Sequence, residues 1–376
     1  MKKTSLPFLV FTVLLSTLVF FQVAAQQSYI TELPSIEISK SDVSDLVWSP
    51  DGHMIAVASG NDIWIYNDTL EQVGHFVGHT QQILTLDWNS DGSRLASAGM
   101  DETIRIWDTT SAHFGEAIEV IPSTTNEVTI VKWNPSGDRL ASVAADQTTP
   151  HSWADNYGNF AWISYRVDIW DASTWNVALT LEPEYIDEWA LAWNISGSQI
   201  AAAGYVIDEE SYAPKIWDAQ TGELIETMGG FGEVGIGNLA FHPTQPDVLA
   251  IASDWGSVII ADVNSNNTLY QFEGFTGAVM RIDWKPDGNA LLDGFDTGQI
   301  LIWDYHTAQL LAVLQAHTGA IQGLKWNNLG TKFASSSVHD GKIKIWDAAS
   351  LLDLSGLPTT TPMPIPTPFP TAASKP

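Results

Sequence analysis

Apolar and polar residues alternate along most of this chain in short runs separated by turn-forming residues. In ILTLDW (83–88) and TIRIW (103–107), apolar side chains recur at every second position, which places them on one face of a β-strand. The intervening groups NSDG (89–92) and MDE (100–102) contain residues that favour tight turns. The pattern therefore predicts short antiparallel strands joined by hairpins.

This unit recurs seven times. Its first apolar run ends at an aromatic residue, found at Trp48, Trp88, Trp133, Trp193, Phe241, Trp284 and Trp326. Its second run ends at Tyr66-Asn67, Trp107-Asp108, Trp170-Asp171, Trp217-Asp218, Ala261-Asp262, Trp303-Asp304 and Trp346-Asp347. A unit this small cannot bury both faces of its sheet, so the copies must stack on one another and can close into a ring. The sequence predicts an all-β propeller of seven four-stranded antiparallel blades.

Three recurring strings carry a resemblance to the WD40 repeat family. They are WSPDG (48–52), GHT (78–80) and IWD, which occurs at 106–108, 169–171, 216–218, 302–304 and 345–347. A related group of propellers, which cap serine peptidases or occur in the periplasm, shares the SPDG turn but lacks the repeated IWD ending. The resemblance covers about residues 36–347 and implies a rigid platform for protein or peptide binding.

In this family, a His, a Ser, an Asp and the Trp of one blade form a buried hydrogen-bonded network. The resemblance assigns these roles in the second repeat to His79, Ser97, Asp101 and Trp107. We expect the network to be structural.

The last repeat matches the same network less cleanly. His317, Asp340 and Trp346 are present, but one extra residue leaves Ser335 and Ser336 as alternative third members. The other five repeats lack the His, so we expect their blades to depend on packing.

The segment SIEIS (35–39) precedes the first repeat at the position where other repeats carry an outer strand. Propellers of this family usually complete their last blade with an N-terminal strand. We therefore expect this segment to pair with residues 342–347, which would remove an exposed sheet edge.

Both ends of the chain differ in composition from the repeats. Residues 1–25 contain Lys2 and Lys3, an apolar stretch and small residues before Gln26, as in a secretory signal peptide. We expect cleavage after Ala25 and a secreted or extracytoplasmic protein; an uncleaved membrane anchor is the alternative. The propeller is expected over 26–354, and the Pro/Thr-rich segment 355–376 is expected to be an extended, disordered tail.

The chain is strongly acidic and contains no cysteine. It has 16 Lys and Arg against 44 Asp and Glu, a formal net charge of −28. This charge disfavours nucleic acid and anionic membranes and favours basic partners, or it simply provides solubility. We expect a monomer without disulfides, stabilised by apolar burial, that associates with no membrane once the signal is removed.

No pattern of catalytic residues, cofactor binding or metal ligation stands out. The sequence lacks GxSxG, a phosphate loop and a dinucleotide fingerprint. His75 and His79 have the spacing of a zinc site, but no helix is expected there. Asp51, Asp91 and Asp287 each precede Gly at hairpins where the family simply turns. We therefore expect a protein that is not an enzyme and has no cofactor or metal.

Two repeats are lengthened on one rim of the propeller, where loops usually carry function. The insertions in repeats three and four, with the connection between them, are rich in aromatic and acidic residues. We interpret them as one binding patch formed by Trp153, Tyr157, Phe160, Trp162, Tyr185, Asp187, Glu188, Trp189, Asp208, Glu209, Glu210 and Tyr212. A lid whose rings pack inward is the alternative structure, and a sugar-binding lectin or an enzyme using the propeller face is the alternative function.

Overall fold

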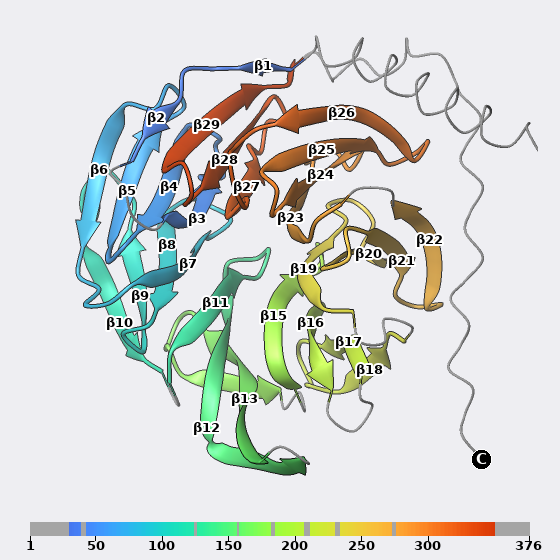
Figure 1. Cartoon of the computed structure of the whole chain (residues 1–376). Helices are drawn as coiled ribbons and strands as arrows, with labels where there is room; N and C mark the ends of the chain where they lie inside the picture. The colour runs from blue at the N-terminus through green and yellow to red at the C-terminus, as the bar shows by residue number, and fades with distance from the viewer. Residues whose placement is uncertain are drawn as a thin grey trace, which may run out of the picture.

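Seven antiparallel β-sheets surround a common axis in the computed structural model (Figure 1). The structure describes residues 30–38, 43–123, 126–155, 158–181, 185–206, 211–229, 234–272 and 276–349. Six sheets have four strands that follow one another in the chain, and the seventh combines three C-terminal strands with the N-terminal segment. This arrangement confirms the predicted seven-bladed propeller.

The first strand of each blade lines the axis (Figure 1). Each ends at the aromatic position that the repeat pattern marks. These inner strands are β3 (Val43–Trp48), β7 (Ile83–Trp88), β11 (Val128–Trp133), β15 (Tyr185–Trp193), β19 (Ile236–Phe241), β23 (Val279–Trp284) and β27 (Gly323–Trp326).

The middle strands of each blade form a hairpin. The second strands are β4 (Met54–Ser59), β8 (Arg94–Gly99), β12 (Arg139–Asp155), β16 (Gln199–Val206), β20 (Val248–Ser253), β24 (Ala290–Phe295) and β28 (Lys332–Ser337). The third strands, each ending at the Asn or Asp of the repeat, are β5 (Asp62–Asn67), β9 (Thr103–Asp108), β13 (Gly158–Asp171), β17 (Ser211–Asp218), β21 (Val258–Asp262), β25 (Gln299–Asp304) and β29 (Lys342–Asp347).

The fourth strands form the outer wall. In the first six blades they are β6 (Gln72–Val77), β10 (Ala117–Pro122), β14 (Val177–Leu181), β18 (Leu224–Thr227), β22 (Asn267–Phe272) and β26 (Gln309–Gln315). Many of their residues are exposed on the outward face and buried on the inward face, as expected for strands that cover a core on one side only.

The N-terminal segment completes the seventh blade, as predicted, but as two short strands instead of one. β1 (Thr31–Glu32) pairs with Asp347 and Trp346 of β29, and β2 (Ile36–Glu37) pairs with Ile343 and Lys342. Pro34 lies between them. Because proline has no backbone N–H, it cannot donate to the ladder at that point.

The apolar core lies between neighbouring blades. One cluster joins Ile63 and Phe76 of the first blade to Leu86, Trp88 and Trp107 of the second. Fully burying a large apolar side chain contributes about 1.5–3 kcal/mol. Each blade is therefore stabilised mainly by the apolar faces of its neighbours, which explains why isolated repeats would not fold.

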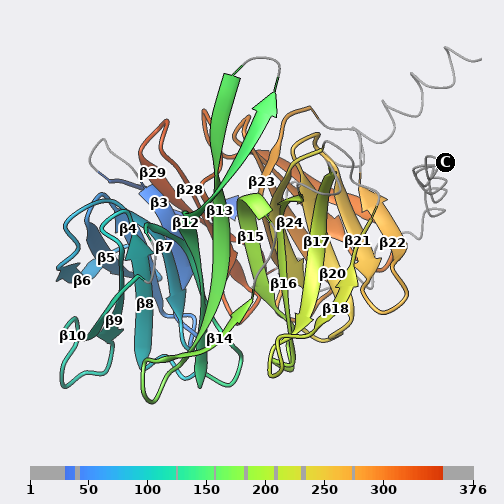
Figure 2. The same ribbon diagram turned by 90° about the horizontal axis from the view of Figure 1, so that it is seen from below.

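The hairpin of the third blade extends well beyond the other blades (Figure 2). The insertion continues β12 and β13 as paired backbone, in which His151 faces Trp162 and Trp153 faces Phe160. Within the described ranges, none of the elements is a helical segment with the length and apolar character that a bilayer crossing requires.

Candidate functional site

The predicted binding patch falls largely on residues whose side chains the structure does not describe. The backbone places Trp153, Phe160 and Trp162 in the β12–β13 hairpin and Tyr185, Asp187, Glu188 and Trp189 in β15. Tyr157, Asp208, Glu209 and Glu210 lie outside the described residues. Tyr212 is partly buried and packs against the core between blades four and five. The patch over blades three and four therefore stays a prediction.

Hairpins between second and third strands meet the connections entering each blade on one rim. The N–H of Met100 donates to the carbonyl of Gln82 (2.9 Å), and the N–H of Asp254 donates to Gly235 (2.9 Å). Neighbouring blades are joined there too, because Ile83 N–H donates to the carbonyl of Gly60 in the first blade (2.8 Å). We call this surface the hairpin rim.

The hairpin rim carries an exposed tryptophan. Trp255, in the β20–β21 turn of the fifth blade, is 75% exposed. Met100 and Val338 occupy the corresponding turns of the second and seventh blades and are also exposed. Sequence reasoning missed Trp255 because it looked for function in insertions, whereas this turn has the ordinary length.

The four residues assigned to the network of the second blade lie in one chain of hydrogen bonds. His79 Nδ1 lies 2.9 Å from the carboxylate of Asp101, and its Nε2 lies 2.7 Å from Ser97 Oγ. Trp107 Nε1 donates to the same hydroxyl (2.8 Å). Burial lowers the pKa of His79, an effect that Asp101 opposes.

The seventh blade contains the same network, and its geometry shows which of the two candidate serines, Ser335 or Ser336, belongs to it. His317 Nε2 lies 2.8 Å from Ser335 Oγ, and Trp346 Nε1 donates to that hydroxyl (2.9 Å). Among the described residues, the buried hydroxyl of Ser336 has no hydrogen-bond partner. The extra residue in this repeat therefore lies after Ser335, in the turn.

These two serines provide a matched test of the network. Both are fully buried neighbours on β28, but only Ser335 has partners. Ser335→Ala leaves the His317 and Trp346 nitrogens unsatisfied and should lower the free energy of unfolding by about 2–3 kcal/mol. Ser336→Ala should change it by less than about 0.5 kcal/mol. Denaturant unfolding of both variants measures the difference; equal effects would contradict the network.

Two other blades retain part of the network. In the third, Trp170 Nε1 donates to Ser142 Oγ (2.8 Å). In the sixth, Asp293 takes the place of the serine and accepts from Trp303 Nε1 (2.6 Å). Asp293 is 1% exposed, and its second oxygen has no partner among the described residues. Burial raises the pKa of this carboxyl to about 8. The sequence offered a signal, because Asp293 precedes its Trp by the same ten residues as Ser97.

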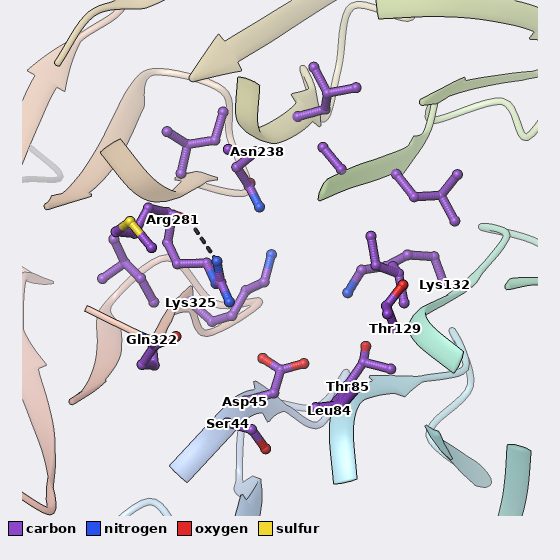
Figure 3. Close-up of a pocket in the computed structure, with 18 of the residues that line it drawn as sticks. Ser44, Asp45, Leu84, Thr85, Thr129, Lys132, Asn238, Arg281, Gln322 and Lys325 are labelled. Carbon is purple, nitrogen blue, oxygen red and sulfur yellow. Dashed lines mark hydrogen bonds between the residues drawn. The ribbon is translucent and has the colours of Figure 1, made fainter. Parts of the chain in front are cut away.

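A cavity of about 710 Å³ lies on the propeller axis and is lined by all seven inner strands. Figure 3 shows Lys132, Asn238, Arg281 and Lys325 directed into this space, with Asp45 beside them. Burial lowers the pKa of the Arg281 guanidinium, and the negative charge of Asp45 partly offsets this effect. Arginine nevertheless keeps its charge in proteins.

Three carboxylates near the axis link successive inner strands. Each accepts a backbone N–H from the next blade: Asp45 from Leu86 (2.9 Å), Asp87 from Trp133 (2.7 Å) and Asp283 from Trp326 (2.7 Å). Burial raises the pKa of Asp87, although Lys132 and the Trp133 amide act in the opposite direction. Because each of these carboxylates bonds to the next blade, together they stabilise the ring.

The aspartates of the repeat motifs are turn residues. Asp108 accepts the N–H of Thr110 (2.7 Å), and Asp91 accepts that of Ser93 (2.8 Å). His75 pairs with Asp62 (3.0 Å), whereas the buried His79 pairs with Asp101 (2.9 Å). The two imidazoles therefore have different partners and do not form one set of metal ligands. Among the described residues there is no group of three or more His, Cys, Asp or Glu suited to a metal ion.

Comparisons with known proteins agree with the geometry. Residues 31–67 and 70–108 match the family described as "WD domain, G-beta repeat", and residues 239–329 match the "Anaphase-promoting complex subunit 4 WD40 domain". The chain is 38% identical over 76 residues to "COMPASS component SWD3" of Saccharomyces cerevisiae, which covers 20% of this chain and 24% of the yeast protein.

Two mammalian proteins show similar matches. "F-box-like/WD repeat-containing protein TBL1Y" of Homo sapiens is 38% identical over 87 residues, covering 22% of this chain and 16% of that protein. "Cilia- and flagella-associated protein 57" of Mus musculus is 37% identical over 79 residues, covering 21% and 6%. The matches thus span less than a quarter of the length of these relatives.

The ring of seven four-stranded sheets, the repeat matches and the His–Ser–Trp–Asp networks together define a class. The chain is a seven-bladed β-propeller, and residues 31–67 and 70–108 match WD40 repeats. Such propellers are typically protein-interaction scaffolds and are usually non-catalytic.

Proposed function

We propose that this propeller binds a protein or peptide through its hairpin rim and does so outside the cytoplasm. The observation that carries the proposal is Trp255, whose indole is 75% exposed at the end of an otherwise buried hairpin. Large aromatic residues dominate the energetics of protein interfaces, because they bury much area with few rotatable bonds. Exposure of such a ring has no role in the packing of the blade.

The charge of the same rim supports a basic partner. Asp254 precedes the indole, is exposed and lines the mouth of the axial cavity. Glu102 and Asp296 are exposed on the corresponding turns of the second and sixth blades. Carboxylates around an aromatic anchor favour Lys or Arg side chains, which can lie over the ring and pair with the rim.

The long hairpin of the third blade extends the same rim. Because β12 and β13 remain paired to Asp155 and Gly158, the insertion presents a β-hairpin beyond the blade tops (Figure 2). We include its residues Trp153, Phe160 and Trp162 in the proposed surface. The yeast relative is named as a COMPASS component, so at least one protein with similar repeats belongs to a larger complex.

Trp255→Ala is the sharpest test within the described residues. Because the indole is exposed, the free energy of unfolding should change by less than about 0.5 kcal/mol. Capture of the native partner by the chain 26–376 should fall at least about tenfold, as expected for an interface anchor.

Ile195→Ala provides the control for this capture experiment. Ile195 is 47% exposed in the β15–β16 turn on the opposite rim, so its truncation should leave capture unchanged. Equal capture by wild type and Trp255→Ala would remove the hairpin rim of the fifth blade from the interface. Recovery of the chain from the culture medium with Gln26 at its N-terminus would support the extracytoplasmic location, and recovery of the intact precursor from the cytosol would contradict it.

A further inference from the structure

The axial cavity contains three cationic side chains from three different inner strands. Lys132 lies on β11, Arg281 on β23 and Lys325 on β27, and all three line the cavity. Figure 3 shows their nitrogen atoms directed toward the same central space. Such a cluster of positive charge is unexpected in a chain with a formal net charge of −28. Apolar side chains could have filled this part of the ring instead.

Two of these cations are already paired with carboxylates. Lys325 Nζ donates to Asp283 Oδ1 (2.6 Å), and Lys132 Nζ lies 3.6 Å from Asp87 Oδ1. Both pairs link neighbouring blades. The two lysines are therefore explained by the closure of the ring.

Arg281 is different. Among the described residues, its guanidinium has no carboxylate within ion-pair distance and donates to the backbone carbonyl of Met280 (2.7 Å). Asp45, the acidic group that acts on it, accepts the N–H groups of Leu46 (2.8 Å) and Leu86 (2.9 Å) with its two oxygens. Guanidinium carries five N–H donors, and Met280 is the only described protein acceptor for them.

Asn238 provides a neutral hydrogen-bond donor near the Arg281 guanidinium (Figure 3). It lies on β19, next to β23, and its side chain points toward the same space as the guanidinium (Figure 3). No hydrogen bond joins its side-chain amide to any other described residue. The guanidinium fork and a single amide donor together fit the oxygens of one carboxylate.

The remaining lining of the cavity combines apolar and polar side chains. Leu84 and Ile130 contribute apolar surface, and the polar residues include Ser44, Thr85, Thr129 and Gln322 (Figure 3). A volume of about 710 Å³ lies within the usual range of small-molecule sites, which combine apolar walls with a few fixed polar groups.

We propose that the axial cavity binds a small monocarboxylic acid, whose carboxylate contacts Arg281 and Asn238. Arg281 is the cation of the cavity that has no carboxylate within ion-pair distance among the described residues. The carboxylates of Asp45 and Asp254 also line the cavity and disfavour a second negative charge, as in a dianion such as phosphate. This proposal does not depend on protein binding at the hairpin rim, although Asp254 and Val338 of that rim also line the cavity.

Calorimetric titration of the full chain with hexanoate and with benzoate tests the proposal. Hexanamide and benzamide are the neutral controls, and inorganic phosphate is the dianionic one. We expect saturable binding of at least one carboxylate and at least tenfold weaker binding of its amide. Absence of saturable binding by both carboxylates at millimolar concentration, equal binding of the amides, or tighter binding of phosphate would overturn the proposal.

Arg281→Met should weaken binding of the carboxylate about 10- to 100-fold, the range expected for loss of charged hydrogen bonds. Arg139→Met is the matched control, because Arg139 also donates to a backbone carbonyl, that of Ala219 (2.7 Å), but lies outside the cavity. Asn238→Leu supplies a second variant that keeps every charge and should weaken binding severalfold. Wild-type affinity in Arg281→Met would overturn the proposal.

Discussion

Asp293→Asn should abolish a loss of stability that the wild-type propeller undergoes as the pH rises from about 4 to about 8. Burial raises the folded-state pKa of Asp293 to about 8, from 3.8 in a solvated carboxyl. Between these values the folded chain holds a proton that the unfolded chain releases, so the free energy of unfolding falls as the pH rises. The full pKa difference corresponds to an upper limit of about 6 kcal/mol.

The geometry explains the direction of this effect. The carboxyl is 1% exposed, and its only described partner is the Trp303 indole, which donates one hydrogen bond. When the group ionises, one donor cannot replace the lost hydration of the anion. Asparagine keeps the shape and the acceptor for Trp303 but has no charge to bury.

Denaturant unfolding of wild type and Asp293→Asn at a series of pH values measures the effect as the difference between the two curves. That difference should be small below pH 4 and grow to several kcal/mol in favour of the variant by pH 9. Asp296→Asn removes an exposed carboxylate from the adjacent turn and should retain the wild-type pH dependence. Parallel curves for wild type and Asp293→Asn would show that Asp293 does not titrate in this range.

Deletion of residues 30–38 should destabilise the propeller and make it self-associate. This segment buries Ile30 and Ile38, each 8% exposed, against the last and first blades. Loss of the two side chains alone should cost about 3–6 kcal/mol. The deletion also exposes β29 along its length, and an unpaired edge strand is a template for intermolecular pairing.

Unfolding by denaturant and light scattering as a function of concentration measure the two consequences. Glu32→Gln is the control: it removes the partly exposed ion pair with Lys344 (2.9 Å) but keeps the strand pairing. Its effect should stay below about 1 kcal/mol. A deletion variant that remains monomeric and unfolds like the full chain would show that the closing strands contribute little.

Repeat number and strand positions could be predicted from the sequence because both depend on local patterns. Alternation with a period of two defines a strand that is buried on one face, and a recurring aromatic residue marks where each inner strand ends. Trp48, Trp133 and Trp326 all end inner strands in the structure. The pairing of the N-terminal segment with β29 could also be predicted, because its position relative to the first repeat matches that of other outer strands.

The arrangement of side chains from different blades could not be predicted in the same way. Ser335 and Ser336 are equally plausible in sequence, but the turn that follows them decides which one faces His317 and Trp346. Sequence reasoning also treated the sixth blade as one that depends on packing. Asp293 was missed because the sequence does not show whether a polar residue of a strand is buried or faces water.

The sequence by itself determined that seven blades form, where their strands end and which strand closes the ring. Only the tertiary structure decided what meets on the axis and what remains exposed on the rim. Arg281 and Asn238 are 43 residues apart in the chain and share one cavity because the curvature of the ring brings adjacent inner strands together. Trp255 is exposed for a similar reason: no described neighbouring blade covers its turn. Strand formation depends on contacts within a repeat, whereas these sites depend on the placement of one repeat against the next.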